Sequence, residues 1–289
     1  MPTHPSTDGQ ERHRFVKNLQ LILGAAAWSL LWLVSLGLAE RLLALALCLS
    51  VPIGLRVLER PVWVRLASGL AAVFGLFSFL LPVGPRAAGL AMIWAISTGV
   101  VALTALWPAP ERQLRSLLAS AGGVYLAVGG AWMVVARWGQ PFMGFDPLLC
   151  LLTANHFHYA GFAAPILASR APRLPAWAGW SILVCPILIA IGITALPLLE
   201  WMGAVLFAGA LIALAVLNLG ADYGGPAVLT RLSWAALLVS MPLAAVYALG
   251  QSFPFQAPSI PWMILSHGLL NAVVFSLGGL AGELTRGAR

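Results

Sequence analysis

The chain has 289 residues, of which 61% are hydrophobic and only 9% are charged, with a mean hydropathy of +0.92. Soluble domains are about half apolar and about a quarter charged, so this composition excludes a soluble globular protein and predicts a polytopic membrane protein. The net charge of +7 does not indicate nucleic-acid binding, because the basic residues lie singly or in pairs at the ends of apolar segments.

The predicted elements begin with a polar stretch at residues 1–18, which we expect to be a cytoplasmic tail. The apolar run at 19–38 is longer than a signal-peptide core of about 7–15 residues, so we expect an uncleaved first span. Nine further apolar segments follow at 42–58, 62–83, 87–107, 114–136, 147–168, 175–196, 201–219, 230–250 and 259–281. Most approach the ~20 residues needed to cross the hydrocarbon layer. We therefore predict an all-α, polytopic transmembrane helix bundle of about ten spans, in a single transmembrane domain over residues 19–289.

The basic residues predict the orientation of these spans. With a cytoplasmic N-terminus, 13 of the 16 Lys and Arg residues fall on the cytoplasmic side, and only Arg41, Arg86 and Arg137 fall outside. Short loops follow this positive-inside bias, so both termini are predicted to be cytoplasmic. The even count also permits two halves of opposite topology, residues 19–136 and 147–281, as in many secondary transporters, although the halves share no visible residue similarity.

The sixth segment contains a cluster of polar residues in the middle of its apolar run: Asn155, His156, His158 and Tyr159. His156 lies about ten residues from the start of the segment, which is roughly 15 Å along a helix and close to the bilayer midplane. Ionisable groups at this depth are costly and mark functional sites by default. Because Asn155 and Tyr159 share one stripe, which His158 borders, His156 is expected to point to another side of the helix.

The tenth segment places two polar residues at a similar depth. His267 and Asn271 are four residues apart and share one helix face, and nearby glycines favour close helix packing. We therefore predict that His158, His267 and Asn271 converge on one cavity. Glu200, in a tight turn without a basic residue, is a candidate for the outer mouth of that cavity or for a water-facing position.

Metal and cofactor chemistry have a weak basis in this sequence. His156 and His158 lie about 200° apart around a regular helix, so one metal ion shared by both would need a broken helix near Gly161 and Pro165. His158 and His267 remain low-probability metal or haem ligands, and no cofactor is predicted. The three cysteines lie in separate apolar runs and are expected to be small buried hydrophobes. Walker, nucleophile-elbow and His-Glu-Xaa-Xaa-His motifs are absent.

Two of these stretches resemble a known family. The run from Thr153 to Phe162, TANHFHYAGF, resembles the signature of the YndJ-like family of bacterial membrane proteins, and Ser266 to Ala272, SHGLLNA, is similar to its C-terminal motif. The apolar stretch at Glu40 and Arg41 is also similar in placement. The resemblance implies a multi-pass protein of the bacterial cytoplasmic (inner) membrane. A transporter label is sometimes attached to the family, and no catalytic role is carried onto these positions.

Three functions are compatible with these residues. A transporter or permease is favoured, because polar side chains at mid-membrane depth suit a binding site in the centre of the bundle and histidine can couple transport to protons. The alternatives are an intramembrane metal- or haem-dependent enzyme, with Tyr159 or Glu200 near the cofactor, and a non-catalytic accessory protein. The predicted partners are the lipid bilayer and a small-molecule or ion substrate that the sequence does not identify. Nucleic acid is not expected, and the oligomeric state is left open.

Overall fold

The computed structural model describes residues 7–107, 109 and 111–287, with side chains from residue 19 to residue 286. The first four predicted spans correspond to α1 (Thr7–Leu30) with η1 (Leu31–Leu33), to α2 (Leu38–Leu45) with η2 (Ala46–Ser50) and α3 (Val51–Val57), to α4 (Val62–Leu80) and to α5 (Pro85–Leu106). Residues 1–6 of the predicted tail lie outside the described residues, and residues 7–18 form the first turns of α1.

The remaining six predicted spans are also helical. They are α6 (Leu114–Trp138), then α7 (Pro147–His156) with η3 (Phe157–Ala163) and α8 (Ala164–Arg170), then α9 (Ala176–Ala195), α10 (Pro197–Leu219), α11 (Val228–Gly250), and finally α12 (Ile260–Met263) with η4 (Ile264–Gly268), η5 (Leu270–Gly278) and α13 (Gly279–Gly287). The described residues contain no strand, so the predicted all-α bundle is confirmed. Eight of these helices are long and apolar enough to cross a membrane.

The two remaining segments differ from those eight for separate reasons. The described apolar part of the first helix, Leu19–Leu33, is short. It is nevertheless attached to two other helices, because Gln20 Nε2 donates to the Arg65 carbonyl of α4 and Trp28 Nε1 donates to the Arg41 carbonyl of α2. The sixth segment is long enough, but Asn155, the two histidines and Tyr159 lower its hydropathy.

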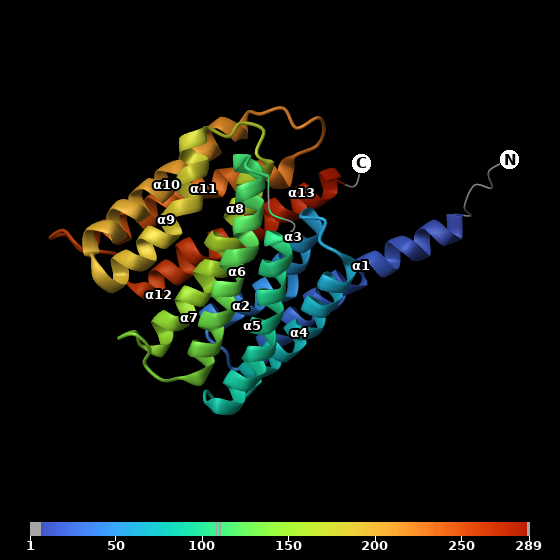
Figure 1. Cartoon of the computed structure of the whole chain (residues 1–289), viewed down its shortest axis with the longest axis horizontal. Helices are drawn as coiled ribbons and strands as arrows, with labels where there is room; N and C mark the ends of the chain where they lie inside the picture. The colour runs from blue at the N-terminus through green and yellow to red at the C-terminus, as the bar shows by residue number, and fades with distance from the viewer. Residues whose placement is uncertain (1–6, 108, 110, 288–289) are drawn as a thin grey trace.

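We call the sixth segment, residues 147–170, the central helix. It passes with α6 through the middle of the bundle, between α1–α5 on one side and α9–α11 on the other (Figure 1). Every residue from 161 to 169 is buried. The second helix, Leu38–Val57, is also an inner helix with 78% of its apolar window buried, whereas only 28% is buried in the C-terminal helix, Ile260–Arg286. The two inner helices are therefore the second helix and the central helix, and the central helix is inside although it contains a polar cluster.

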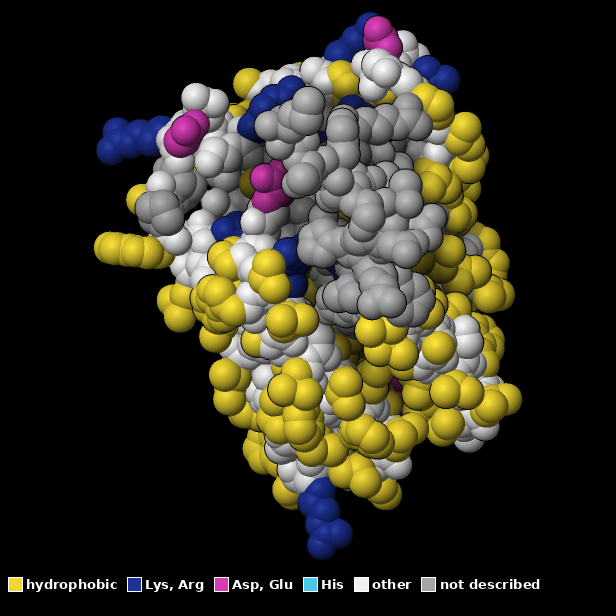
Figure 2. All heavy atoms as spheres, turned by 90° about the vertical axis from the view of Figure 1, so that its right-hand side faces the viewer, with side chains coloured by type: hydrophobic (Ala, Val, Ile, Leu, Met, Phe, Trp, Pro, Cys, Tyr) yellow, Lys and Arg dark blue, Asp and Glu magenta, His cyan; other side chains and the backbone are white. Residues whose placement is uncertain are grey.

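Apolar side chains cover much of the surface that would face lipid. In Figure 2, most visible charged side chains gather in the upper part of the face, apolar side chains occupy the lower part, and one basic side chain marks the lower end. Exposed Leu66, Leu70 and Phe77 on α4, and Ile96 and Leu103 on α5, contribute to this apolar surface. An apolar surface between charged ends is the pattern expected of a membrane-spanning bundle.

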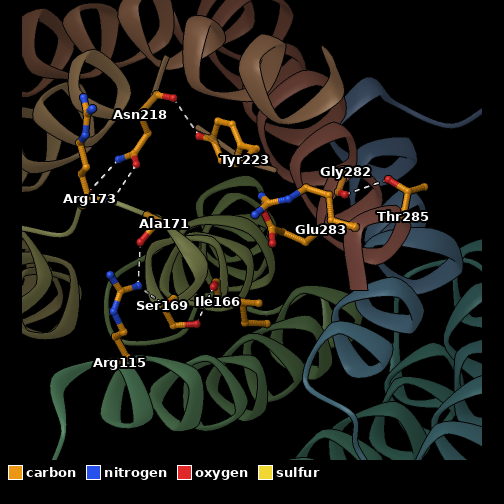
Figure 3. Close-up of polar contacts among 11 residues, drawn as sticks. Arg115, Ile166, Ser169, Ala171, Arg173, Asn218, Tyr223, Gly282, Glu283 and Thr285 are labelled. Carbon is orange, nitrogen blue, oxygen red and sulfur yellow. Dashed lines mark hydrogen bonds and ion pairs between the residues drawn. The ribbon is translucent and has the colours of Figure 1, made fainter. Parts of the chain in front are cut away.

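Arginine side chains bind the carbonyl groups that are left open where helices end. The last four carbonyls of a helix have no partner within it, and lipid offers none. Arg115 Nη1 donates to the carbonyls of Ser169 and Ala171 at 2.7 Å each, at the end of α8 (Figure 3). Arg170 donates to the Val57 carbonyl at the end of α3, and Arg60, whose pKa is lowered by burial, donates to the Thr104 carbonyl.

The same end of the bundle carries a second polar cluster, centred on Asn218 (Figure 3). The Asn218 side-chain amide accepts from the Arg173 backbone N–H at 3.0 Å and donates to the Arg173 carbonyl at 2.9 Å. The backbone carbonyl of Asn218 accepts from the Tyr223 hydroxyl. Arg286 pairs with Glu283 and lies over the Tyr223 ring. Burial raises the pKa of Tyr223. These contacts join helix ends that were all predicted to be cytoplasmic, as the alternating topology requires.

Loss of one arginine cap should lower stability measurably. We expect Arg115→Met to lower the thermal unfolding midpoint of the detergent-purified protein by about 2–5 °C, because bonds from a charged donor to two or more carbonyls contribute about 1–2 kcal/mol when partly exposed. Arg112→Met is the matched control, since Arg112 is exposed on the same predicted side and makes no side-chain hydrogen bond to the described residues. Equal midpoints for the two variants would show that the Arg115 contacts do not stabilise the fold.

Candidate functional site

The polar residues of the central helix are each held by a backbone carbonyl. His156 Nδ1 lies 2.8 Å from the Leu152 carbonyl, and His158 Nδ1 lies 2.8 Å from the Ala154 carbonyl. Asn155 Nδ2 donates to the carbonyls of Leu151 and Ala39, and the Tyr159 hydroxyl donates to the Leu42 carbonyl at 2.5 Å. Asn155 and Tyr159 therefore fasten the central helix to α2, and they occupy one face of it as predicted.

His158 forms a closed structural contact with Trp94. Its side chain is fully buried, and its Nε2 accepts a hydrogen bond from the Trp94 indole Nε1 at 3.0 Å. A carbonyl can only accept, so Nδ1 carries the proton and Nε2 provides the lone pair that the indole requires. Both ring nitrogens of His158 are thus used within the protein, by α7 and by α5. The sequence predicted that the His158 ring lies in a cavity with His267. In the structure this ring lies against Trp94.

The ring that faces His267 belongs to His156. The two ring centroids are 6.4 Å apart and the ring planes differ by 28°. His156 is exposed by surface area, whereas His158, two residues on, has no exposed surface. His267 therefore has His156 as its ring neighbour from the central helix, whereas the predicted neighbour, His158, lies against Trp94. The reason is that the face containing residues 152 and 156 is the one directed toward the C-terminal helix.

His267 and Asn271 share a small polar group with Ser240 of α11. His267 Nδ1 lies 2.9 Å from the Ser240 carbonyl, the Ser240 hydroxyl donates to Asn271 Oδ1 at 3.3 Å, and Asn271 Nδ2 donates to the His267 carbonyl. The amide nitrogen of Asn271 also lies 3.2 and 3.4 Å from the two ring nitrogens of His267. His267 and Asn271 therefore share one helix face, and Ser240 of α11 contacts both of them.

The protonation pattern of the two facing imidazoles follows from their carbonyl contacts. Each Nδ1 donates to a carbonyl, in His156 to Leu152 and in His267 to Ser240, so in the neutral rings each Nε2 carries a lone pair. His156 Nε2 has no hydrogen-bond partner among the described residues. His156 thus offers an acceptor atom beside the His267 ring, and the hydrogen bonds and ring contacts of the two imidazoles involve no carboxylate of the described residues. We refer to His156, His267, Asn271 and Ser240 as the imidazole site.

Irregular helical turns meet around this site. The segments η2, η3, η4 and η5 are all π-helical, and they belong to the second, central and C-terminal helices. These three helices pack against one another through their π-helical turns. π-Helical turns are rare in proteins and occur frequently at functional sites. In α11, Pro242 lies two residues beyond Ser240. Because proline has no backbone N–H, one helical hydrogen bond is missing in this part of α11.

Glu200 lies elsewhere. It is in the first turn of α10, where the backbone passes so close to α9 that a Cβ added at Gly192 would meet the Glu200 nitrogen at 2.1 Å. No hydrogen bond or ion pair joins Glu200 to the imidazole site within the described part of the chain. Nothing in these contacts tests its predicted place at an outer mouth.

The donor set near the imidazole site is small. Among the described residues, no three His, Cys, Asp or Glu side chains lie close enough together to hold a metal ion. Cys48, Cys150 and Cys185 are free and buried, as predicted. Two imidazoles from neighbouring helices could at most supply two ligands to a metal or to haem iron, and His158, the predicted candidate ligand, has no free nitrogen.

Sequence reasoning missed one buried charged contact. Glu40 does not pair with the adjacent Arg41; its Oε1 accepts from Arg137 Nη1 at 3.2 Å, across 97 positions of the chain. Arg137 Nη2 also donates to the carbonyls of Ser78 and Leu81 at the end of α4. Arg41 instead donates to the Val34 carbonyl and lies over the Trp32 ring. A carboxylate and an arginine both predicted at outer span ends were the available signal for this pair.

Comparison with known proteins identifies one family. The model of that family, described as YndJ-like protein, matches residues 41–275. A relative from Bacillus subtilis (strain 168), described as "Uncharacterized membrane protein YndJ", is 32% identical over 225 residues, which cover 74% of this chain and 40% of the relative. The chain thus spans about two fifths of the length of that relative. No solved structure matches the chain.

The two histidines of the central helix should respond differently to substitution. We expect His158→Phe to lower the thermal unfolding midpoint clearly, because it leaves the buried Trp94 N–H without an acceptor, at a cost of about 1–3 kcal/mol. His156→Phe is the matched control from the same helix, and it should change the midpoint little because its ring is exposed. A larger loss in His156→Phe than in His158→Phe, measured by intrinsic fluorescence during heating, would contradict these roles.

Proposed function

The chain belongs to the YndJ-like family of membrane proteins, and we propose that it is a carrier that binds a small polar solute at the imidazole site. The observation that supports this best is the facing pair His156 and His267, 6.4 Å apart between the central and C-terminal helices. Each ring is oriented by a backbone carbonyl through Nδ1, and Nε2 of His156 has no partner among the described residues and can bind a solute. An imidazole with an unpaired ring nitrogen is energetically unfavourable inside a membrane, and a purely structural role does not offset that free energy.

The form of the surrounding helices supports a carrier. Secondary transporters build their binding sites at mid-membrane depth from helices whose regular hydrogen bonding is interrupted. Here the three helices with π-helical turns meet beside the site, and α11 contributes Ser240 next to Pro242. Such turns can rearrange at low cost because their hydrogen-bond pattern is already irregular. We propose that the protein lies in a bacterial cytoplasmic membrane, with both chain ends in the cytoplasm.

The chemistry of the site restricts the class of solute. The hydrogen bonds and ring contacts of the two imidazoles involve no carboxylate, so a bound cation would lack a counter-charge. A neutral solute with an O–H or N–H donor fits the free Nε2 of His156, and an anion fits if the imidazoles are protonated. Imidazole titrates near neutrality in water, so binding of an anion would take up protons and could couple transport to a proton gradient.

An intramembrane metal- or haem-dependent enzyme is the alternative, and its basis is weaker. It needs at least three suitable ligands, or two imidazoles aligned on opposite sides of haem iron, whereas His158 is occupied by Trp94. Metal and haem analysis of the purified protein distinguishes the two functions. A stoichiometric metal or haem that is lost from both His156→Phe and His267→Phe would favour the enzyme and contradict the carrier.

A thermal-shift screen tests the carrier directly. We expect at least one solute from a panel of small polyols, amides and carboxylate, nitrate and phosphate anions to raise the unfolding midpoint of the wild type by about 2 °C or more. The stabilisation should be lost in His156→Phe and His267→Phe, because both remove an Nε2 acceptor. The shift caused by a stabilising anion should increase as the pH is lowered, since only protonated imidazoles neutralise its charge.

The control for this screen is Ser97→Ala, which removes a hydroxyl between α4 and α5 that bonds Ser68, away from the imidazole site. It should retain the full shift. The solute identified in this way should then accumulate in proteoliposomes that contain the wild type and not in those that contain His267→Phe. A solute that stabilises wild type and both histidine variants equally would place the binding site elsewhere in the molecule.

A further inference from the structure

A separate pocket lies at the predicted outer end of the central helix. It has a volume of about 160 Å³ and is enclosed by the first turn of α2, the turn between α4 and α5, the end of α6 and the start of α7. The lining residues are Glu40, Val83, Ala136, Arg137, Pro147, Leu148 and Leu151. Val83 and Leu148 are exposed on the outer surface of the bundle. The pocket therefore opens at the rim where an outer-leaflet lipid would lie.

The two charges in this pocket are incompletely satisfied by the protein. Arg137 and Glu40 make a single contact of 3.2 Å, longer than the 2.7–2.9 Å that is usual for such charged hydrogen bonds. Arg137 has a side-chain exposure of only 5%, and its Nε has no partner. The contacts of Arg137 to Glu40, Ser78 and Leu81 use three of its five N–H donors. Glu40 Oε2 accepts from the Gly37 amide, and the Glu40 side chain remains 24% exposed.

A ligand for this pocket must carry both signs of charge. The formal charges of Glu40 and Arg137 cancel, so a simple cation is repelled by the arginine as strongly as the carboxylate attracts it, and a simple anion meets the reverse. A zwitterion avoids both conflicts, because its ammonium can bind Glu40 while its phosphate or carboxylate binds the unused donors of Arg137. The volume is below the 300–1,000 Å³ of ordinary small-molecule pockets, which suits a head group rather than a whole molecule.

We propose that this pocket binds the phosphate–ammonium head group of an outer-leaflet phospholipid of the phosphatidylethanolamine type. The ammonium hydrogen-bonds to Glu40, the phosphate is bound by Arg137, and the acyl chains lie along the exposed apolar side chains of Val83 and Leu148. This site is independent of the imidazole site, because none of the residues that line it belongs to the imidazole site. Its failure in experiment would leave the proposed carrier untouched.

The test measures lipid binding to the delipidated protein by native mass spectrometry, with dioleoyl lipids that differ only in the head group. We expect phosphatidylethanolamine to bind the wild type about tenfold more tightly than phosphatidylglycerol, since one hydrogen bond to a charged group is typically worth about this factor. Phosphatidylcholine should also bind more weakly, because its quaternary ammonium has no N–H to donate. Equal binding of phosphatidylethanolamine and phosphatidylglycerol by the wild type would overturn the proposal.

Two variants that retain Arg137 locate the binding. Glu40→Gln should reduce the preference for phosphatidylethanolamine to about twofold or less, and Leu151→Trp, which fills the pocket without altering either charge, should abolish it. Leu70→Trp is the control, since it adds the same ring on the exposed surface of α4 and should behave as wild type. Unchanged preference in Leu151→Trp would overturn the assignment to this pocket. Soluble phosphoethanolamine that binds as tightly as the lipid would overturn the assignment to a membrane lipid.

Discussion

The constraint on which this structure depends is that hydrocarbon cannot satisfy the polar side chains of the central helix. Asn155, His156, His158 and Tyr159 would each cost several kcal/mol if they faced lipid without partners. Each of these side chains hydrogen-bonds a backbone carbonyl, and His158 adds the Trp94 indole. Most of these partners come from α2, α5 and α7 itself, so the helices that supply them must pack closely around the central helix. The central helix is for this reason an inner helix despite its polar residues.

Close packing around polar groups in turn requires small residues on the neighbouring helix. A Cβ at Gly129 of α6 would lie 2.8 Å from His158 Nδ1, and a Cβ at Gly122 would lie 3.1 Å from Ile166 and from the Phe162 carbonyl. On the central helix itself, a Cβ at Gly161 would lie 2.8 Å from the Tyr125 side chain. Small residues allow helix axes to approach within a membrane. The contacts that enclose His158 thus depend on glycines as much as on the polar side chains.

Much of this arrangement can be predicted from the sequence, for physical reasons that also explain the errors. Spanning helices follow from apolar length, and the polar cluster at Asn155 to Tyr159 is conspicuous because the rest of its helix is apolar. The partner of each histidine was not predictable in the same way. A regular helix assigns faces at about 100° per residue, but η3 begins at Phe157 with a wider turn, and the indole that binds His158 comes from Trp94, 64 positions away. The pair of Glu40 and Arg137 is even more remote in sequence, since its members are 97 positions apart.

The first half of the central helix serves both proposed sites through different faces. Pro147, Leu148 and Leu151 line the outer pocket, and one turn further along the same face Asn155 bonds α2 at Ala39, the residue next to Glu40. The face of residues 152 and 156 turns toward His267 instead. Asn155 Oδ1 is buried and has no hydrogen-bond partner among the described residues. Unused polar capacity in a membrane interior is unfavourable unless a ligand or a second conformation uses it. Both proposals therefore use the half of the central helix that precedes the fully buried run from 161 to 169.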